Sequence, residues 1–242
     1  MKCTINFTKK IKGASSMDKH RFSQLYWKNY ISVEKEFMQT LSYIDFDKEN
    51  YKVFSSAYIK LLLQIGSEID IVAKSFCRHY NNLLNVKNID EYRKEILKYV
   101  PDFASAEVKI LQGDVIHLIK PWGAWNITAA ASQPSNPIWW KVYNMVKHHR
   151  TESGSIEGES KEYYKFANLE YTLFALAGLY QILIYYFFEL AKTERIKVPL
   201  PGSHLFELSG GKWDTIIFYQ DFAFYVDDSD GNLYSETGEF IY

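Results

Sequence analysis

"YTLFALAGLYQILIYYFF", Tyr171 to Phe188, runs for eighteen residues without a charged side chain. A segment of this length and composition fits either a buried helix or a membrane span. Thr172 and Gln181 interrupt the apolar run, and basic residues flank it on both sides, so the flanking charges indicate no membrane orientation. A helix that is apolar on every side is also typical of the centre of a soluble bundle. We therefore expect a buried central helix, with membrane association as the alternative.

The chain before this segment has the apolar periodicity of helices rather than of strands. Three segments show it: 22–44, 50–80 and 89–99. Between Glu107 and Lys120, two short alternating runs flank Gln112-Gly113-Asp114, which predicts a β-hairpin. The polar, glycine-containing segment 151–160 is expected to be a mobile loop. After Pro199 and Pro201 the chain alternates and becomes aromatic, which predicts further antiparallel strands.

These patterns predict a mainly α fold, a helical bundle with a small inserted β-hairpin and a C-terminal antiparallel β appendage. Residues 1–21 are expected to form an N-terminal tail or short strand. Residues 22–198 would form the bundle, with the hairpin at about 107–120, and residues 199–242 the appendage packed on it.

The composition limits the classes of function. The 242 residues are 47% hydrophobic, enough for a sizeable core, and 28 basic side chains balance 29 acidic ones. Because the net charge is −1, any contact with RNA must come from a local basic patch, and nothing indicates DNA binding. Cys3 and Cys77 provide neither a disulfide framework nor zinc-ligand spacing, which favours a cytoplasmic protein.

No familiar cofactor motif occurs in the sequence. We find no phosphate-binding Walker loop, no dinucleotide-binding glycine pattern, no nucleophile elbow and no zinc-peptidase motif. The sequence therefore predicts no cofactor and no metal site.

The segment "PIWWKVYNMVKHHR", residues 137–150, contains the densest group of chemically versatile side chains. Ser135 or Asn136 can cap a helix that starts near Pro137. On that helix Asn144 and His148 share a face, and Tyr143 and Arg150 share an adjoining stripe. The residues expected to pack inward are Trp139, Val142, Met145 and Val146.

A second polar patch interrupts an earlier apolar helix, at Ser67, Glu68, Asp70 and Lys74. Glu68 and Asp70 project about 200° apart, so at most one of them can face the helix of residues 137–150. We expect that one to be Glu68, because Asp70 already has Lys74 as a partner four residues on. A buried Glu68 would orient His148 and raise the pKa of its imidazole.

Purely structural interpretations compete with a site. Cations at positions 147–150 stabilise the C-terminal end of a helix through its dipole. Asp70 and Lys74 form an ordinary helix-surface pair, and Trp139 and Trp140 can be packing residues. Both interpretations stay open from the sequence alone.

The helix order, "SEIDIVAK", and "YNMVKHHR" followed by "ANLEYTLFALAGLY" resemble the HEPN superfamily of helical bundles over roughly residues 20 to 195. Some members of that superfamily carry a motif on one helix: an arginine, a polar residue, three variable residues and a histidine. Members with this motif are similar to one another in being metal-independent endoribonucleases that work as dimers. Asn144 and His148 match that pattern, but Tyr143 occupies the position of the arginine. A neutral tyrosine cannot supply the charge that would hold the scissile phosphate.

The resemblance implies a HEPN-like homodimer of a bacterial defence or stress system, and it leaves three functions open. The first is a non-catalytic or degenerate module that binds RNA, a nucleotide or a protein partner. The second is a metal-independent endoribonuclease, and the third is a membrane-associated helical protein. For the ribonuclease the catalytic residues would be His148, Arg150, Asn144, Lys147 and Glu68. The substrate-binding residues would be Tyr143, Trp140, Asp70 and Lys74.

Overall fold

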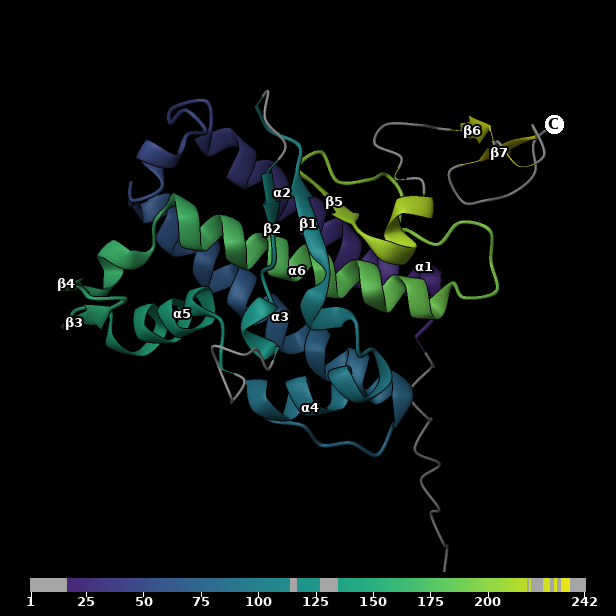
Figure 1. Cartoon of the computed structure of the whole chain (residues 1–242), viewed down its shortest axis with the longest axis horizontal. Helices are drawn as coiled ribbons and strands as arrows, with labels where there is room; N and C mark the ends of the chain where they lie inside the picture. The colour runs from purple at the N-terminus through teal and green to yellow at the C-terminus, as the bar shows by residue number, and fades with distance from the viewer. Residues whose placement is uncertain are drawn as a thin grey trace, which may run out of the picture.

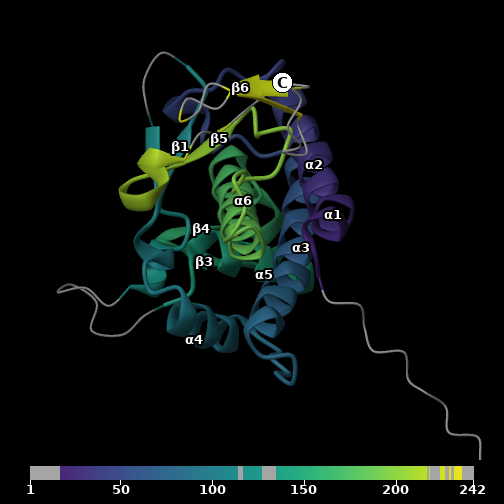
Figure 2. The same ribbon diagram turned by 90° about the vertical axis from the view of Figure 1, so that its right-hand side faces the viewer.

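α6, Leu169–Leu190, runs through the middle of the molecule, and the other elements surround it (Figure 1). The computed structural model describes residues 17–113, 117–126, 135–216, 218, 224–226, 229 and 232–235. Most of the N-terminal tail expected over residues 1–21 lies outside these ranges. Asn168 starts α6, because its side chain accepts a hydrogen bond from the Tyr171 amide at 2.9 Å. Figure 2 views α6 nearly end-on, with α2 and α3 on one side and β1 on the other.

Among the described residues, α6 is the helix that is long and apolar enough to cross a membrane. However, 78% of its most apolar 18-residue window is buried inside the molecule. Such burial is expected of the core helix of a soluble protein, where neighbouring elements cover every side. The prediction of a buried central helix is confirmed.

The bounds of the remaining helices are α1 Lys19–Phe22, a π-helical continuation Ser23–Trp27, α2 Lys28–Thr40, α3 Ser56–Tyr80, α4 Ile89–Tyr99 and α5 Ile138–His149. α1, α3 and α4 begin at side-chain caps, and α2 continues from α1 through a π-helical turn, whereas α5 begins after Pro137 without the side-chain cap expected from Ser135 or Asn136. α1 begins at Lys19, before the start that was expected at Phe22, because the Asp18 side chain accepts a hydrogen bond from the Arg21 amide at 2.8 Å. α3 begins after the expected Asn50, because Ser55 caps it. The mainly helical fold is confirmed.

The predicted hairpin is confirmed, and it belongs to a larger sheet. β1, Glu107–Ile110, pairs antiparallel with β2, His117–Ile119. The other edge of β1 pairs antiparallel with β5, Phe206–Ser209, so that the strand order is β2-β1-β5. The first strand of the C-terminal region therefore completes a sheet begun about a hundred residues earlier. β6, Phe224–Val226, and β7, Leu233–Ser235, form a separate antiparallel pair.

The segment between α5 and α6 was expected to be a mobile loop, and this prediction was wrong. β3, Ser153–Ile156, and β4, Glu159–Glu162, form an antiparallel hairpin there. Its two-residue turn is Glu157-Gly158, and both residues have positive φ, 51° and 81°. Such a turn matches the twist of paired strands, but it usually carries Asn or Asp before the glycine. Because glutamate is uncommon at the first position of such a turn, the hairpin was not predicted from the sequence.

A buried carboxylate attaches the C-terminal region to α2. Glu34 is 2% exposed and accepts hydrogen bonds from the hydroxyls of Tyr30 and Ser203 and from the His204 amide, the last at 2.8 Å. Burial, with Glu34 beside it, holds the pKa of Tyr30 well above its usual range, so the phenol remains a donor. This network fixes the chain just before β5.

Candidate functional site

A hollow of about 550 Å³ lies where α3, the start of α4 and α5 meet, below α6 in the view of Figure 1. It brings together all four candidate substrate-binding residues and two of the five candidate catalytic ones. Its lining consists of Ser67, Asp70, Lys74, Lys87, Asn88, Ile89, Asn136, Trp140, Lys141, Tyr143, Asn144, Met145 and Lys147.

α5 provides one wall of the hollow, and its apolar face packs against the core. Trp139, Val142 and Val146 are buried as expected, and the Trp139 indole donates to the Pro121 carbonyl at 2.8 Å. The Trp139 ring also packs against Gly178 in the middle of α6. Met145 is only partly buried, because it packs against the edge of the core and also lines the hollow. The opposite stripe of α5 is thereby left to face the hollow.

Tyr143 joins α5 to α3 and positions a lysine. Its side chain is 3% exposed and lies on Gly66, where an added Cβ would be 2.3 Å from a ring carbon. Its hydroxyl accepts a hydrogen bond from Lys147 Nζ at 3.2 Å. Tyr143, where the HEPN resemblance would expect an arginine, is therefore a packing residue that holds Lys147 at the wall.

Asn144 is fixed against its own helix. Its amide nitrogen donates to the Trp140 carbonyl at 2.9 Å, one turn earlier. The side chain is partly buried at the wall of the hollow, where its polar atoms can meet a ligand.

Asp70 and Lys74 of α3 belong to the opposite wall, and the buried Tyr92 of α4 lies behind Asp70. Lys74 pairs with the Asp70 carboxylate, and the Tyr92 hydroxyl donates to it at 2.6 Å. Burial and the nearby Asp70 raise the pKa of Tyr92, so its phenol stays protonated. Asp70 is consequently a well-partnered carboxylate.

The prediction that Glu68 faces α5 was wrong. Glu68 is hydrogen-bonded to Asn29 of α2, and burial raises the pKa of its carboxyl. As the geometry of a helix requires, only one of Glu68 and Asp70 can face α5, and it is Asp70. The sequence could not show that α2 offers a polar partner on the other side of α3.

The electrostatic character of the hollow is basic. Four lysines line it, Lys74, Lys87, Lys141 and Lys147, against the single carboxylate of Asp70. Within the described part of the chain, only Lys74 of these four forms an ion pair with a carboxylate. The formal charge of the lining is therefore +3, in a chain whose net charge is −1.

His148 and Arg150 do not line the hollow. Both are exposed at the C-terminal end of α5, together with His149, whose Nδ1 is 2.9 Å from the Glu152 carboxylate. His148 shares the face of Asn144, but it lies one turn further along, past the residues that border the hollow. The structure thus does not assemble the expected group of His148, Arg150 and Glu68.

Sequence reasoning missed four residues of the hollow: Lys87, Asn88, Asn136 as a lining residue, and Lys141. Lys141 could have been predicted as a site residue, because it lies three residues before Asn144 on the same side of the helix. Asn88 and Glu91 form a recognisable helix start, in which the Glu91 amide donates to Asn88 at 3.0 Å. Nothing in the sequence showed that this start lies beside α5.

Among the described residues, no group of three or more His, Cys, Asp or Glu side chains is placed to hold a metal ion. Comparisons with protein-family models, with curated proteins and with solved structures found no match to this chain. The HEPN resemblance therefore stays a prediction, and the hollow between α3, α4 and α5 is the feature from which a function can be inferred.

Proposed function

We propose that this hollow binds the phosphate of a nucleotide or of an RNA, and that the chain is a non-catalytic, HEPN-like binding module of a bacterial defence or stress system in the cytoplasm. The observation that carries the proposal is the convergence of Lys87, Lys141 and Lys147, none paired with a carboxylate in the described chain, on one hollow. Phosphate oxygens are strong acceptors for such ammonium groups.

Each wall has a part in this binding. Lys141 and Lys147 would contact phosphate oxygens from α5, and Lys87 from the segment just before α4. Asn88 and Asn144 offer hydrogen bonds to phosphate or sugar hydroxyls. Trp140 and Tyr143 give the lining an aromatic component that suits a ribose or base. Asp70 keeps Lys74 at the wall of the hollow through their ion pair.

The same geometry favours binding over cleavage. A general base must come within hydrogen-bond reach of the proton that it removes, and His148 lies outside the hollow. Tyr143, which replaces the family's arginine, is buried, and its hydroxyl is already engaged by Lys147. Among its described residues, the hollow therefore has neither a histidine nor an arginine that would stabilise the charge of the transition state.

The test is a binding titration of a nucleoside monophosphate and of a short 5′-phosphorylated RNA. Lys141→Gln/Lys147→Gln should weaken binding of both ligands by roughly tenfold or more, because each lysine forms a charge-assisted hydrogen bond. The matched control is Lys35→Gln/Lys48→Gln, which removes two exposed lysines outside the hollow. For the RNA, the dependence of affinity on salt should also become shallower, by roughly 0.7 for each lysine–phosphate pair that the variant removes.

Two outcomes would contradict the proposal. Equal affinities for the hollow variant and its control would show that the lysines of the hollow do not hold the ligand. Cleavage of RNA in the presence of EDTA, abolished in His148→Ala, would instead establish the metal-independent endoribonuclease.

We also infer a homodimer, on the strength of the HEPN resemblance and of the exposure of His148 and Arg150 at the end of α5. In this arrangement two copies of α5 would meet around a twofold axis. Light scattering should give twice the mass of the 28.4 kDa chain. A single-chain mass at high protein concentration would contradict the dimer but would leave the binding proposal intact.

A further inference from the structure

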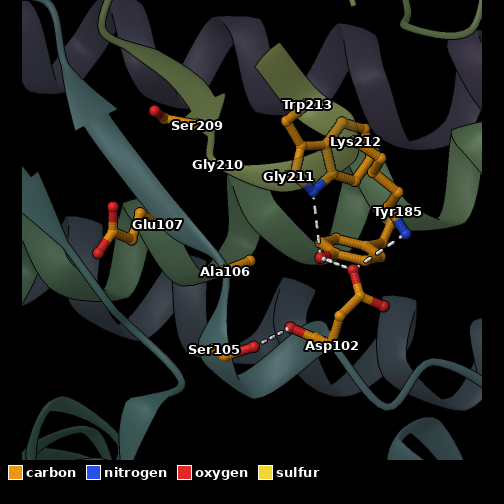
Figure 3. A pocket seen from close by; sticks show the side chains of 10 residues that line it. All are labelled: Asp102, Ser105, Ala106, Glu107, Tyr185, Ser209, Gly210, Gly211, Lys212 and Trp213. Carbon is orange, nitrogen blue, oxygen red and sulfur yellow. Dashed lines mark hydrogen bonds and ion pairs between the residues drawn. The ribbon is translucent and has the colours of Figure 1, made fainter. Parts of the chain in front are cut away.

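A second hollow, of about 420 Å³, lies between α6, the segment after α4, and the turn after β5 (Figure 3). Its lining is Asp102, Ser105, Ala106, Glu107, Tyr185, Ser209, Gly210, Gly211, Lys212 and Trp213. Neither the sequence motifs nor the proposed phosphate site involves these residues.

One ammonium group in this hollow is surrounded by aromatic rings. Lys212 Nζ lies 4.6 Å from the centroid of the Tyr185 ring, 5.0 Å from Trp213 and 5.2 Å from Phe188. It is also 3.1 Å from an Asp102 carboxylate oxygen. Several rings with a carboxylate around one cation form the kind of site that proteins use to recognise ammonium groups.

This aromatic cage, consisting of Tyr185, Phe188, Trp213 and Asp102, is held together without Lys212. The Trp213 indole donates to the Tyr185 hydroxyl at 3.1 Å, and that hydroxyl donates to Asp102 at 2.8 Å, as the dashed lines of Figure 3 show. Tyr185 is 1% exposed and Trp213 is 2% exposed. The Trp213 ring also packs edge-on against Tyr185 and Phe188, at 4.8 and 5.3 Å. The core thus fixes the cage in place.

Lys212, in contrast, is held only by charge and by the rings. Its side chain is 36% exposed, and the Asp102 side chain is 49% exposed. It follows Gly210 and Gly211, both with positive φ, and a Cβ at either would meet nothing within 4 Å. Because this turn is open to solvent, rotation of the lysine side chain alone can empty the cage.

We propose that the cage is a binding site for an alkylammonium group, a lysine side chain, its methylated form or a small amine, which displaces Lys212. Once Lys212 leaves, the described lining has no cation and the Asp102 carboxylate has lost its ion-pair partner, whereas Glu107 stays paired with Lys120 at 3.1 Å, so Asp102 makes the hollow favour a positively charged ligand. In the free protein Lys212 competes with the ligand and lowers its apparent affinity according to the fraction of cages that it occupies. This site is independent of the proposed phosphate site and has the opposite charge preference.

The experiment measures binding of choline by calorimetry to the full chain and to Lys212→Ala. The variant should bind choline about tenfold or more tightly than the wild type, because the competing ammonium is gone. The uncharged carbon analogue of choline, 3,3-dimethyl-1-butanol, should gain much less, because it has no charge to interact with the rings. Lys52→Ala is the matched control, since Lys52 also lies over a tyrosine ring, 5.2 Å from the Tyr171 centroid, and pairs with a carboxylate, Glu170, outside this hollow, so its removal should leave the affinity unchanged.

A peptide with a single trimethylated lysine separates the two sources of the ligand. Tighter binding of the peptide than of choline assigns the site to a protein partner, and tighter binding of choline assigns it to a small amine. Unchanged choline affinity in a Lys212→Ala protein that melts cooperatively, or equal gains for choline and its neutral analogue, would overturn the proposal.

Discussion

Asp70 shows how a carboxylate can belong to a basic site without being a reactive group. It pairs with Lys74 and accepts a hydrogen bond from Tyr92, and the other lysines of the hollow stay without such a partner in the described chain. Its negative charge therefore opposes the binding of an anion while its hydrogen bonds support the fold. A substitution that removes the charge of the Asp70 side chain and keeps its shape separates these two roles.

Asp70→Asn should tighten the binding of a nucleoside monophosphate several-fold, because it removes the only carboxylate among the described residues of the lining. It should also lower the free energy of unfolding by about 1 kcal/mol, through weaker bonds to Tyr92 and Lys74. Titration calorimetry and thermal melting measure the two effects. Glu68→Gln is the control, because Glu68 faces Asn29 on α2 and its replacement should leave the affinity unchanged. Weaker binding in Asp70→Asn would mean that the carboxylate contacts the ligand itself.

Among the contacts between helices, the one between α3 and α5 forms the wall of the hollow. The Tyr143 ring occupies the space that a side chain at Gly66 would need. A glycine inside a helix normally costs about 1 kcal/mol relative to alanine, so its presence here has a packing reason. The close approach of the two helices brings Lys147 to the same hollow as Asp70 and Lys74.

Gly66→Ala should destabilise the protein by about 1–3 kcal/mol, because the clash with Tyr143 exceeds the gain in helix propensity. In a Tyr143→Ala background the same change should be neutral or stabilising, since the ring is gone. Denaturant unfolding of the four proteins measures this double-mutant cycle. Equal costs of Gly66→Ala in both backgrounds would show that the tyrosine ring does not set the distance between the helices.

The elements that the sequence predicted well are those with a strong local signal. α6, the helical pattern of residues 137–150 and the β1–β2 hairpin follow from periodicity and turn residues. The β3–β4 hairpin was missed because its turn begins with Glu157 instead of Asn or Asp. The choice between Glu68 and Asp70 was wrong because it depends on which helix packs on which side of α3. Which residues become neighbours in this way, such as Lys87 beside α5, depends on tertiary packing and cannot be predicted from a single sequence.

Considered as a whole, the molecule buries many groups that must stay protonated. Burial raises the pKa of the Cys77 thiol from 9.0 to about 12 and that of the Tyr186 phenol from 10.0 to about 12. In the unfolded chain these groups lose their protons near the lower values, whereas in the folded chain they keep them. Their contribution to stability is therefore complete below pH 9 and is lost as the pH rises toward 12.

The free energy of unfolding should fall increasingly steeply as the pH rises above about 9, with about 1 kcal/mol per pH unit of that slope from Cys77 and the rest from the buried tyrosines. Urea unfolding at a series of pH values measures this slope. Cys77→Ala should make the slope between pH 9 and 10 shallower by about 1 kcal/mol per pH unit and leave the part that the buried tyrosines contribute. An unchanged slope in that variant would show that the thiol does not titrate differently in the two states.

The proposed function depends on a local basic hollow in a chain that is almost neutral overall, and it is tested most directly by locating the ligand. Backbone and indole NMR signals of the labelled protein should be followed during titration with a nucleoside monophosphate and with the matching nucleoside. We expect the monophosphate to shift signals of Lys74, Asn88, Trp140, Asn144 and Lys147, which line the hollow, and the nucleoside to shift them far less. Shifts confined to His148 and Arg150, or equal shifts with and without the phosphate, would contradict a phosphate site between α3, α4 and α5.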